Sequence, residues 1–380
     1  MREGWEYKKL GELVQVLNGY AFKSSLYENQ GIRVLRITNV QKGNIVDDDP
    51  KYYPLSLTDE IRNYLLKESD LLMSLTGNVG RVGLLTKEML PAALNQRVAC
   101  LRILSNGLNL GFLFHYLNSD KFEQDSVLSA KGIAQKNMST EWLKDYKLPL
   151  PPISVQQSIV SELDKINELI RLKKEQLKDY DNLAQSIFYE MFGDEKYERR
   201  KLKDIVKVKS GQVSPLEDPY CDMVHVGPAN IESNTGRLIN LKTAKEENLI
   251  SGKYLFDSSM VLYSKIRPNL NKVTIADFEG ICSADMYPLI PSKSIDKKFL
   301  LFILKQKEFL SYAIANSGRA NIPKINREDL LEYSTILPPL SLQLQFAERL
   351  ALIEKQKEQI SSIIKDLETL LASRMQYWFD

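Results

Sequence analysis

The sequence predicts an α+β protein built by pseudo-twofold duplication, in which two globular domains are joined by two long antiparallel coiled-coil helices. Two observations predict this fold: a proline-rich motif that occurs twice at a fixed separation, and a heptad pattern of apolar residues after each copy. The length agrees with it, because 380 residues, of which 43% are hydrophobic and 26% charged, suffice for two or three domains with cores of their own.

The repeat is clearest at the proline motif. The segment LPPISVQ at residues 150–156 matches LPPLSLQ at residues 337–343, an offset of 187 residues. The same offset carries Phe192 onto Phe379, whereas the beginnings of the two halves match at an offset of 192 residues, as from Gly19 to Gly211. Loop insertions produce such a drift, so we infer a duplicated unit of about 187 residues.

The segments before the two motifs, residues 1–150 and 194–337, mix short β-like runs with helical stretches. Runs such as residues 98–104 and 260–263 are rich in Val, Ile and Leu, and turn sequences separate them. A single helix is expected at about 110–121 and another at 297–315. The mixture favours two α+β globular domains over a doubly wound sheet with regular βαβ units.

The segments after the motifs, residues 151–193 and 338–380, are predicted to be coiled-coil helices. Apolar residues recur there at alternating steps of four and three, interrupted by Lys173, Lys357 and Arg374. The two helices pack most simply on each other, antiparallel, with the duplicated domains at opposite ends. The alternative is that each helix docks on its own domain. The predicted seam consists of Ile159, Leu163, Ile166, Ile170, Leu177, Phe346, Leu350, Ile353, Ile360, Ile364 and Leu367.

Composition excludes several classes of protein. The formal net charge is only +2, which argues against a non-specific coat on nucleic acid but leaves a locally basic groove open. The three cysteines, Cys100, Cys221 and Cys282, are far apart and form no CxxC pair, so we expect a reducing compartment and no structural zinc. The N-terminus resembles neither a signal peptide nor a transit peptide, which favours a cytoplasmic protein.

The sequence shows no recognisable catalytic or metal centre. It contains neither a GxxxxGK[ST] phosphate loop nor the Asn-Pro-Pro-aromatic motif of amino methylation, because Leu precedes both Pro-Pro pairs. His115 lies in an aromatic helical run and is interpreted as a core or boundary residue, and His225 has no second ligand nearby in the sequence. We therefore expect a chain that is not an enzyme and binds no metal.

Both halves resemble the specificity subunit of type I restriction-modification systems. The resemblance rests on LPLPPISVQQSIVSELDKI and ILPPLSLQLQFAERLALI, and on the glycine-polar segments at residues 130–137 and 316–322. It covers essentially the whole chain. It departs at Leu344, where the first half has Gln157, and at Phe346, where the first half has Ile159.

This resemblance implies a function. In that family each mixed segment is a target recognition domain that reads one half of a bipartite, asymmetric DNA site. The two helices set the distance between the half-sites and bind two modification subunits, which use S-adenosylmethionine to methylate adenine. Restriction subunits that hydrolyse ATP, with Mg²⁺, then join. The cofactors are thus expected on the partner subunits, and none in this chain.

Arg, Lys, Asn and Gln are the side chains that read base edges in the major groove, and they cluster in the predicted loops. We favour the groups at 131–137, 267–272 and 319–324. The other interpretation of each residue is that it lies in a solvated loop without contacting DNA, and the other interpretation of Pro268 and Asn269 is that they form a simple turn. The candidate DNA-binding residues are Arg36, Asn39, Lys42, Asn78, Arg81, Gln96, Arg97, Lys131, Gln135, Lys136, Asn137, Asn230, Arg267, Asn269, Asn271, Lys272, Arg319, Asn321 and Lys324.

A second class of function stays open. Heptad periodicity alone also fits a coiled-coil scaffold or adaptor whose globular domains bind protein partners. Loss of methylation after charge reversal at Arg267, Lys272, Arg319 or Lys324 would favour the DNA-recognition subunit over the scaffold. A methyltransferase or nuclease in its own right is a third class, which binding of S-adenosylmethionine to the isolated chain would support.

Overall fold

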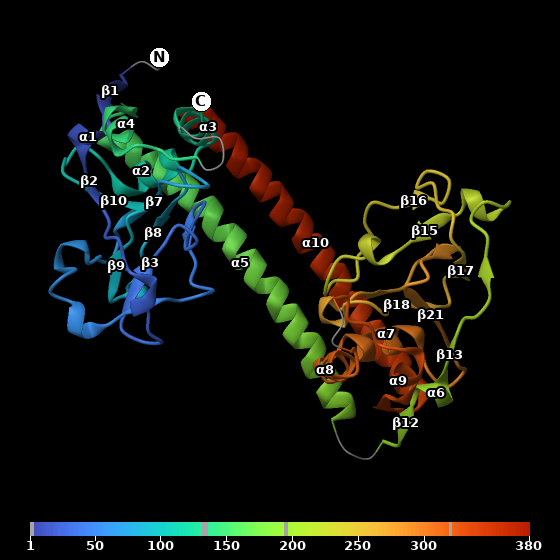
Figure 1. The fold of residues 1–380 in the computed structure, drawn as a ribbon. Coiled ribbons are helices and arrows are strands. Elements are labelled where there is room, and N and C mark those ends of the chain that lie inside the picture. Colours follow the sequence, from blue (N-terminus) through green and yellow to red (C-terminus); the bar gives the residue numbers. More distant parts are fainter. Residues whose placement is uncertain (1–3, 131–135, 194–196, 319–320) are drawn as a thin grey trace. The chain divides into compact units, whose positions relative to one another are not determined.

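The computed structural model describes residues 4–130, 136–193, 197–318 and 321–380. The chain forms two compact units, Met1–Glu175 with Ser361–Asp380, and Gln176–Ile360. Each unit contains one globular domain and a part of each long helix, α5 (Ile153–Phe192) and α10 (Leu340–Phe379) (Figure 1). These units divide the long helices, whereas the sequence-based boundaries give each helix a segment of its own.

The first unit is built around a four-stranded antiparallel sheet in the order β2 (Val14–Asn18), β10 (Val98–Ile103), β7 (Leu71–Ser74) and β8 (Val82–Leu84). In a second sheet, β3 (Ile32–Leu35) lies between β6 (Tyr52–Tyr53) and the parallel β9 (Ala92–Leu94). The remaining elements are β1 (Glu6–Lys9), which pairs with β11 (Lys147–Leu150), β4 (Val40–Gln41), which pairs with β5 (Asn44–Ile45), and α1 (Leu10–Leu13), α2 (Leu110–Leu117), α3 (Asp120–Ser129) and α4 (Thr140–Asp145).

The second unit repeats this plan. Its four-stranded antiparallel sheet has the order β13 (Val206–Val208), β21 (Met286–Pro291), β18 (Val261–Ser264) and β19 (Val273–Thr274). Its second sheet has the order β14 (Gln212–Val213), β17 (Lys253–Phe256), β20 (Gly280–Cys282), β15 (Val224–Val226) and β16 (Lys242–Thr243), with β15 and β20 parallel. The remaining elements are β12 (Arg199–Lys201), which pairs with β22 (Ser334–Ile336), and α6 (Leu202–Ile205), α7 (Lys297–Lys305), α8 (Lys307–Ala315) and α9 (Arg327–Glu332).

These two units confirm the predicted α+β class and the duplication. The single helices predicted at 110–121 and 297–315 are wrong, because each is two helices. Ser119 has an extended backbone and accepts a hydrogen bond from the Phe122 amide (3.3 Å), so it caps a new helix, α3. Gln306, also extended, separates α7 from α8.

The glutamine of the proline motif is fully buried in both halves. Gln156 Oε1 accepts a hydrogen bond from the Asn109 amide (2.8 Å), and its Nε2 donates to the carbonyls of Gly107 (2.9 Å) and Pro151 (2.8 Å). Gln343 makes the same three contacts 187 residues later, with Asp296, Ser294 and Pro338. The motif therefore ties the first turn of each long helix to the loop before α2 or α7.

The long helices run antiparallel to each other within each unit. In the first unit, Glu162 of α5 accepts hydrogen bonds from the Arg374 guanidinium and from Trp378 Nε1 (3.0 Å) of α10, and Lys174 pairs with Glu368 (2.8 Å). Residue numbers thus rise along one helix and fall along the other. In the second unit, Asp181 pairs with Lys357 (2.8 Å). Arg374 and Lys357 interrupt the apolar seam. Each of them forms an ion pair with a carboxylate of the other helix, Arg374 with Glu162 and Lys357 with Asp181.

The predicted seam is buried between the helices and under the domains. The first turns of α5, with Ile159 and Leu163, belong to the core of the first domain, and so does Phe379 at the end of α10. In the second domain, Phe346 in the first turns of α10 and Phe192 at the end of α5 belong to the core in the same way. Helix pairing and docking on a domain therefore occur together. Leu177, Leu350 and Leu367 are half-buried, and the buried seam residues are Ile159, Leu163, Ile166, Ile170, Phe346, Ile353, Ile360 and Ile364.

The ion pair between Glu162 and Arg374 predicts a coupling between the helices. Because both side chains are about two-thirds buried, we expect the effects of Glu162→Gln and Arg374→Gln on the free energy of unfolding to be non-additive by about 0.5–3 kcal/mol. Urea denaturation of both single variants and the double variant measures this coupling. Arg171→Gln is the control, because Arg171 is exposed and its ion-pair partners among the described residues, Glu168 and Glu175, lie on its own helix. Strictly additive effects would contradict a stabilising pair.

The buried glutamines predict a second stability effect. Gln343→Leu removes the acceptor of the Asp296 amide and the donor to two carbonyls, so we expect it to lower the free energy of unfolding by about 1–3 kcal/mol. Gln345→Leu, at an exposed position of the same helix, should change it by less than about 0.5 kcal/mol. Equal effects of the two variants in urea denaturation would show that the contacts of Gln343 contribute nothing.

Candidate nucleic-acid interface

The duplication brings three loops together at the end of the central sheet in each domain. In the first domain the Leu75 amide donates to the Arg97 carbonyl (3.0 Å), the Met138 amide to the Leu75 carbonyl (2.9 Å), and the Gly77 amide to the Lys136 carbonyl (3.0 Å). We call the residues 75–78, 95–97 and 136–138 the first loop junction. Loops that a rigid sheet holds in place are where proteins most often place binding residues.

The second domain contains the same junction with the same backbone contacts. The Lys265 amide donates to the Asp285 carbonyl (3.0 Å), the Ile325 amide to the Lys265 carbonyl (2.9 Å), and the Arg267 amide to the Pro323 carbonyl (2.7 Å). We call the residues 265–272, 283–285 and 321–325 the second loop junction. The isolated bridges agree, since Thr76 pairs with Asn137 and Ile266 pairs with Lys324.

The first loop junction contains a hollow with polar walls. Its volume is about 430 Å³, and Thr76, Gln96, Arg97 and Asn137 line it together with Leu75. Three of the predicted DNA-binding residues therefore share one site, and Asn78 and Lys136 are exposed beside it. Thr76 Oγ1 lies 3.5 Å from Asn137 Oδ1. Two further predicted residues, Lys131 and Gln135, lie outside the described residues.

The second loop junction presents a turn with a left-handed residue on either side. The Leu270 amide donates to the Arg267 carbonyl and the Asn271 amide to the Pro268 carbonyl, both at 2.9 Å, so Pro268 and Asn269 form the turn that the sequence allowed. The φ angles of Arg267 and Asn271 are +48° and +47°. The turn leaves Arg267 and Asn269 exposed.

The other predicted residues of the second junction differ in whether their side chains form hydrogen bonds within the domain. Lys272 donates to the Pro228 carbonyl (2.7 Å) and Asn271 to the Lys305 carbonyl (3.4 Å), so both side chains support the loop. Asn321 and Lys324 are exposed. The predicted residue Arg319 lies outside the described residues.

Three predicted residues outside the junctions have structural contacts instead. Asn39 is buried, accepts from the Arg36 amide (2.9 Å) and donates to the Val46 carbonyl (2.8 Å), while the Arg36 guanidinium donates to the Asp49 carbonyl (2.6 Å). These contacts hold the loop between β3 and β6.

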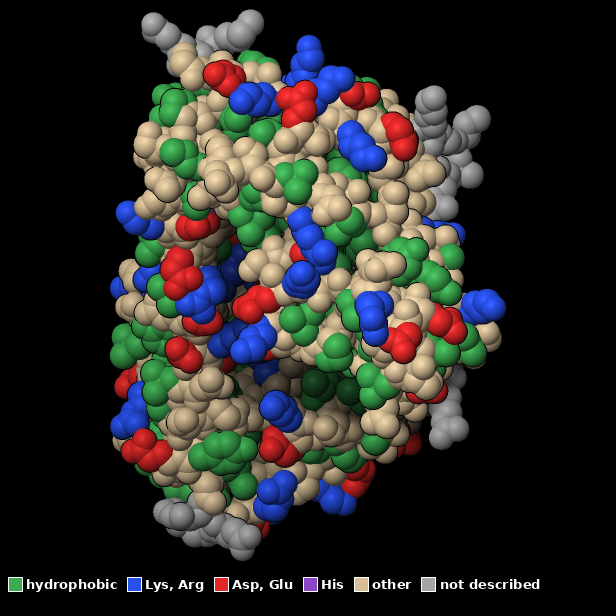
Figure 2. Space-filling model, turned by 90° about the vertical axis from the view of Figure 1, so that its left-hand side faces the viewer, with side chains coloured by type: hydrophobic (Ala, Val, Ile, Leu, Met, Phe, Trp, Pro, Cys, Tyr) green, Lys and Arg blue, Asp and Glu red, His purple; other side chains and the backbone are tan. Residues whose placement is uncertain are grey.

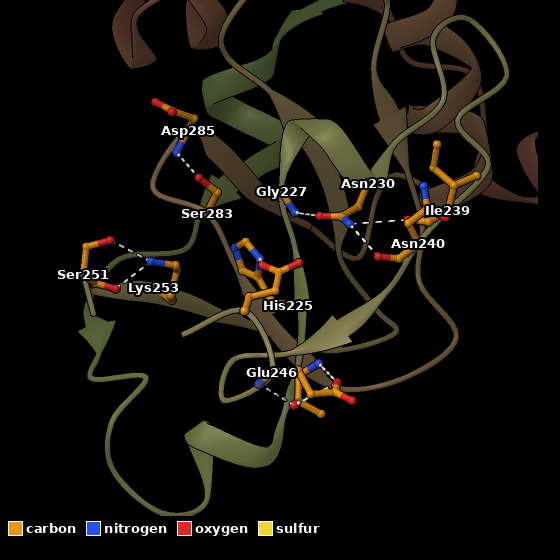
Figure 3. Close-up of polar contacts among 12 residues, drawn as sticks. His225, Gly227, Asn230, Ile239, Asn240, Glu246, Ser251, Lys253, Ser283 and Asp285 are labelled. Atoms are coloured by element: carbon orange, nitrogen blue, oxygen red, sulfur yellow. Dashed lines mark hydrogen bonds and ion pairs between the residues drawn. The ribbon is translucent and has the colours of Figure 1, made fainter. Parts of the chain in front are cut away.

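Asn230 is buried in the same way in the second domain (Figure 3). It accepts from the Gly227 amide (2.9 Å) and donates to the carbonyls of Ile239 (3.3 Å) and Asn240 (3.1 Å). Asn39 and Asn230 therefore stabilise loops of their own domains. Their side-chain amides are hydrogen-bonded to the backbone and do not contact a base in this conformation.

Lys42 and Arg81 of the first domain lie among acidic and amide groups. Lys42 pairs with Asp120 (2.9 Å) and Glu123 (2.7 Å), and Arg81 donates to Gln41 (2.5 Å). Both side chains are therefore already engaged within the first domain. On the face drawn in Figure 2, Lys and Arg side chains are interspersed with Asp and Glu.

Both histidines are structural, as their sequence surroundings indicate. His115 Nε2 lies 2.7 Å from Asp164, and His225 Nδ1 lies 2.7 Å from Glu247. Burial lowers the pKa of each imidazole, against the raising effect of its carboxylate partner. His115 thus links α2 to α5, and His225 links β15 to the turn that follows β16.

Two further buried titratable groups of the second domain are Lys253 and Cys282. Lys253 is 4% exposed, and its amine donates to the carbonyl (2.6 Å) and hydroxyl (2.7 Å) of Ser251 (Figure 3). Burial lowers the pKa of this amine. Burial also raises the pKa of Cys282, and of Cys100 in the first domain, to about 12. A protonated thiol is a poor nucleophile.

One group of side chains has the spacing of metal ligands. Potential ligand atoms of Asp218, Cys221 and Asp222 lie within 4.8 Å of one another, but both carboxylates are exposed. Cys221 Sγ lies 3.1 Å from Asp218, and this carboxylate raises the pKa of the thiol. Because the thiolate is the metal-binding form, we assign no metal to this group.

Sequence reasoning missed Thr76 and Asp285 of the junctions. Thr76 lines the first hollow, and Asp285 forms a 3.6 Å ion pair with Lys265 in the second junction. The repeat itself was the available signal, because the offset of 187 residues aligns Asn137 with Lys324.

No described helix combines the length and apolar composition needed to span a membrane.

Comparisons with known proteins agree with this duplicated architecture. The family model described as "Type I restriction modification DNA specificity domain" matches residues 2–179 and again residues 194–369. The curated specificity subunit of the type I restriction enzyme EcoDI from Escherichia coli is 38% identical over 149 residues, which cover 39% of this chain and 33% of that protein. The chain thus aligns with about a third of the length of that relative.

Two further comparisons cover nearly the whole chain. The putative MjaX specificity subunit from Methanocaldococcus jannaschii is 23% identical over 403 residues, 97% of this chain and 93% of that protein. The crystal structure of the S subunit from M. genitalium superposes with a TM-score of 0.56 at 14% identity, covering 99% and 96% of the two chains. Since the family model matches each half separately and the matches span most of the chain, the chain belongs to the family of type I restriction-modification specificity subunits.

Proposed function

We propose that this chain is the non-catalytic DNA sequence-recognition subunit of a type I restriction-modification complex, and that each target recognition domain reads one half of a bipartite, asymmetric DNA site. The observation that carries this proposal is the pair of loop junctions. Their backbone contacts are the same, whereas the side chains at the positions that these contacts align are different, as in Gly77 against Arg267 and Asn137 against Lys324. A shared scaffold with different side chains is what two readers of different half-sites require.

The side chains at the junctions have the chemistry for reading DNA. Gln96, Arg97 and Asn137 line the first hollow, and amides and guanidinium groups are the common partners of adenine and guanine in the major groove. The net charge of +2 is compatible with this role if partner subunits supply much of the phosphate neutralisation. The proposal places the protein in the cytoplasm, where the DNA is.

Docking of partner subunits is the second part of the proposal. Both long helices expose large apolar side chains, and apolar residues one turn apart on a helix are the anchors by which a helix binds in a partner's groove. In the first unit, Leu169 and Leu172 of α5 are 47% and 46% exposed, one helical turn apart. In the second unit, Leu352 of α10 is 67% exposed. We propose that these residues bind the two modification subunits, and that restriction subunits join the resulting complex.

The chemistry then belongs to the partners. S-adenosylmethionine is expected on the modification subunits, and ATP and Mg²⁺ on the restriction subunits. The alternative function, a coiled-coil scaffold whose domains bind protein, has no specific contact in its favour, since the exposed polar side chains of the junctions suit base edges better than a protein interface, whose centre is depleted of charge.

Charge reversal at the second junction tests DNA recognition. We expect Arg267→Glu combined with Lys324→Glu to abolish adenine methylation that depends on this chain, because carboxylates would face the DNA. Genome-wide mapping of methylated adenines in cells with and without the gene, and with the variant, measures this. Lys293→Glu is the control, as Lys293 is exposed at the other end of β21. Undiminished methylation by the double variant would favour the scaffold.

Substitution on the helices tests partner docking. We expect Leu169→Asp with Leu172→Asp to lower the amount of modification subunit that copurifies with the chain, because charges would enter an apolar contact. Leu55→Asp is the matched control, since Leu55 is 66% exposed on the first globular domain. Unchanged copurification of the helix variant, or an equal loss with the control, would contradict docking at this surface.

A further inference from the structure

Two independent properties separate the candidate DNA-binding residues. The first is position, because only some of them lie at a loop junction. The second is whether the side chain already has a hydrogen-bond or ion-pair partner. Arg36, Asn39, Lys42, Arg81 and Asn230 fail the first test, and all five are engaged with carboxylates, amides or carbonyls of their own domain.

Among the described candidates, the residues that pass both tests are Asn78, Gln96, Arg97, Lys136, Arg267, Asn269, Asn321 and Lys324, and of these Gln96 and Arg97 also line the first hollow. In the first domain the side chains of Gln96 and Arg97 are exposed at the junction, and the contacts among the described residues give neither of them a side-chain partner. In the second domain the same is true of Arg267 and Lys324. The Lys272 amine, by contrast, already donates a hydrogen bond to the Pro228 carbonyl. An unengaged polar side chain needs no rearrangement before it contacts a base, so affinity is not lost to breaking existing contacts.

The backbone at Arg267 adds a separate observation. The junction contacts align Arg267 with Gly77, because the Arg267 amide donates to the Pro323 carbonyl as the Gly77 amide donates to the Lys136 carbonyl. Gly77 has a φ of +77° and Arg267 a φ of +48°. This left-handed region suits glycine but is unfavourable for a residue with a side chain. The second junction thus holds a strained arginine where the first has glycine, and strain of this kind occurs most often at functional sites.

On the proposed function as its basis, we propose that Gln96 and Arg97 set the base specificity of the first half-site, and that Arg267 and Lys324 set that of the second. Glutamine pairs with adenine through N6 and N7, and arginine and lysine with guanine through O6 and N7. The first junction therefore reads an adenine and a guanine, and the second reads guanine. The two half-sites differ because the same scaffold carries different side chains at aligned positions, Gly77 against Arg267 and Asn137 against Lys324.

Base readers and phosphate contacts have different signatures. Loss of a base contact relaxes one letter of the recognised motif, whereas loss of a phosphate contact weakens binding about equally at all sequences. A good bidentate contact is worth about 5- to 150-fold in discrimination between the right and the wrong base. The relevant measurement is therefore the motif itself, read at single-letter resolution, rather than total methylation.

The sharpest variant is Arg267→Gly, since it installs the residue of the first junction and relieves the left-handed backbone. It should fold at least as well as the wild type, with an unchanged or higher melting temperature. We expect it to relax a guanine in one half-site, lowering discrimination there by about 5- to 150-fold, and to leave the other half-site unchanged. Gln96→Ala and Arg97→Ala should relax an adenine and a guanine in the other half-site. Arg62→Ala and Lys293→Ala, exposed residues away from both junctions, are the controls.

Mapping methylated adenines genome-wide for the full-length variants, expressed with the partner subunits, distinguishes the possible failures. Motifs that keep every letter in all four junction variants, Lys324→Ala included, overturn this inference while the proposed function stands. A uniform fall in methylation without a change of letters also overturns it, because it assigns these side chains to phosphates. A genome in which no methylated motif depends on the wild-type chain overturns the proposed function itself.

Discussion

The core of each globular domain is completed by the ends of two helices that come from different halves of the chain. Phe379, at the end of α10, packs on Phe112 and Tyr116 of the first domain, with ring centroids 5.8 and 5.5 Å apart. Phe192, at the end of α5, packs on Phe299 of the second domain at 5.4 Å. Because apolar burial is the main favourable contribution to folding, neither core is complete until the two helices pair antiparallel.

This constraint explains which parts of the duplication are alike. The proline motif and its buried glutamine position the first turn of each helix, and the four-stranded sheets position the loop junctions, so both features recur with the same contacts. Side chains on the exposed side of the junctions make none of these contacts and are free to differ. One scaffold therefore carries two different sets of exposed side chains, and the clearest difference between them is Gly77 in the first junction against Arg267 in the second.

The sequence predicted the fold well because its signals were local or repeated. Heptads, the proline motif and short β-like runs depend on neighbouring residues, and all three correspond to elements of the structure. The site was harder to predict. Asn39 and Asn230 have the same residue type as Asn137, but burial commits their amides to the backbone. That distinction depends on tertiary packing, as does the break of each predicted single helix at Ser119 or Gln306, and neither appears in residue type or spacing.

A structure of the assembled complex on duplex DNA that carries its own methylated motif would show where the DNA lies on the two domains. We expect both loop junctions to lie in DNA grooves, one on each half-site, with Arg97 and Arg267 within hydrogen-bond distance of base edges. Junctions that face solvent or a partner protein, with the DNA held by other surfaces of the two domains, would contradict this expectation.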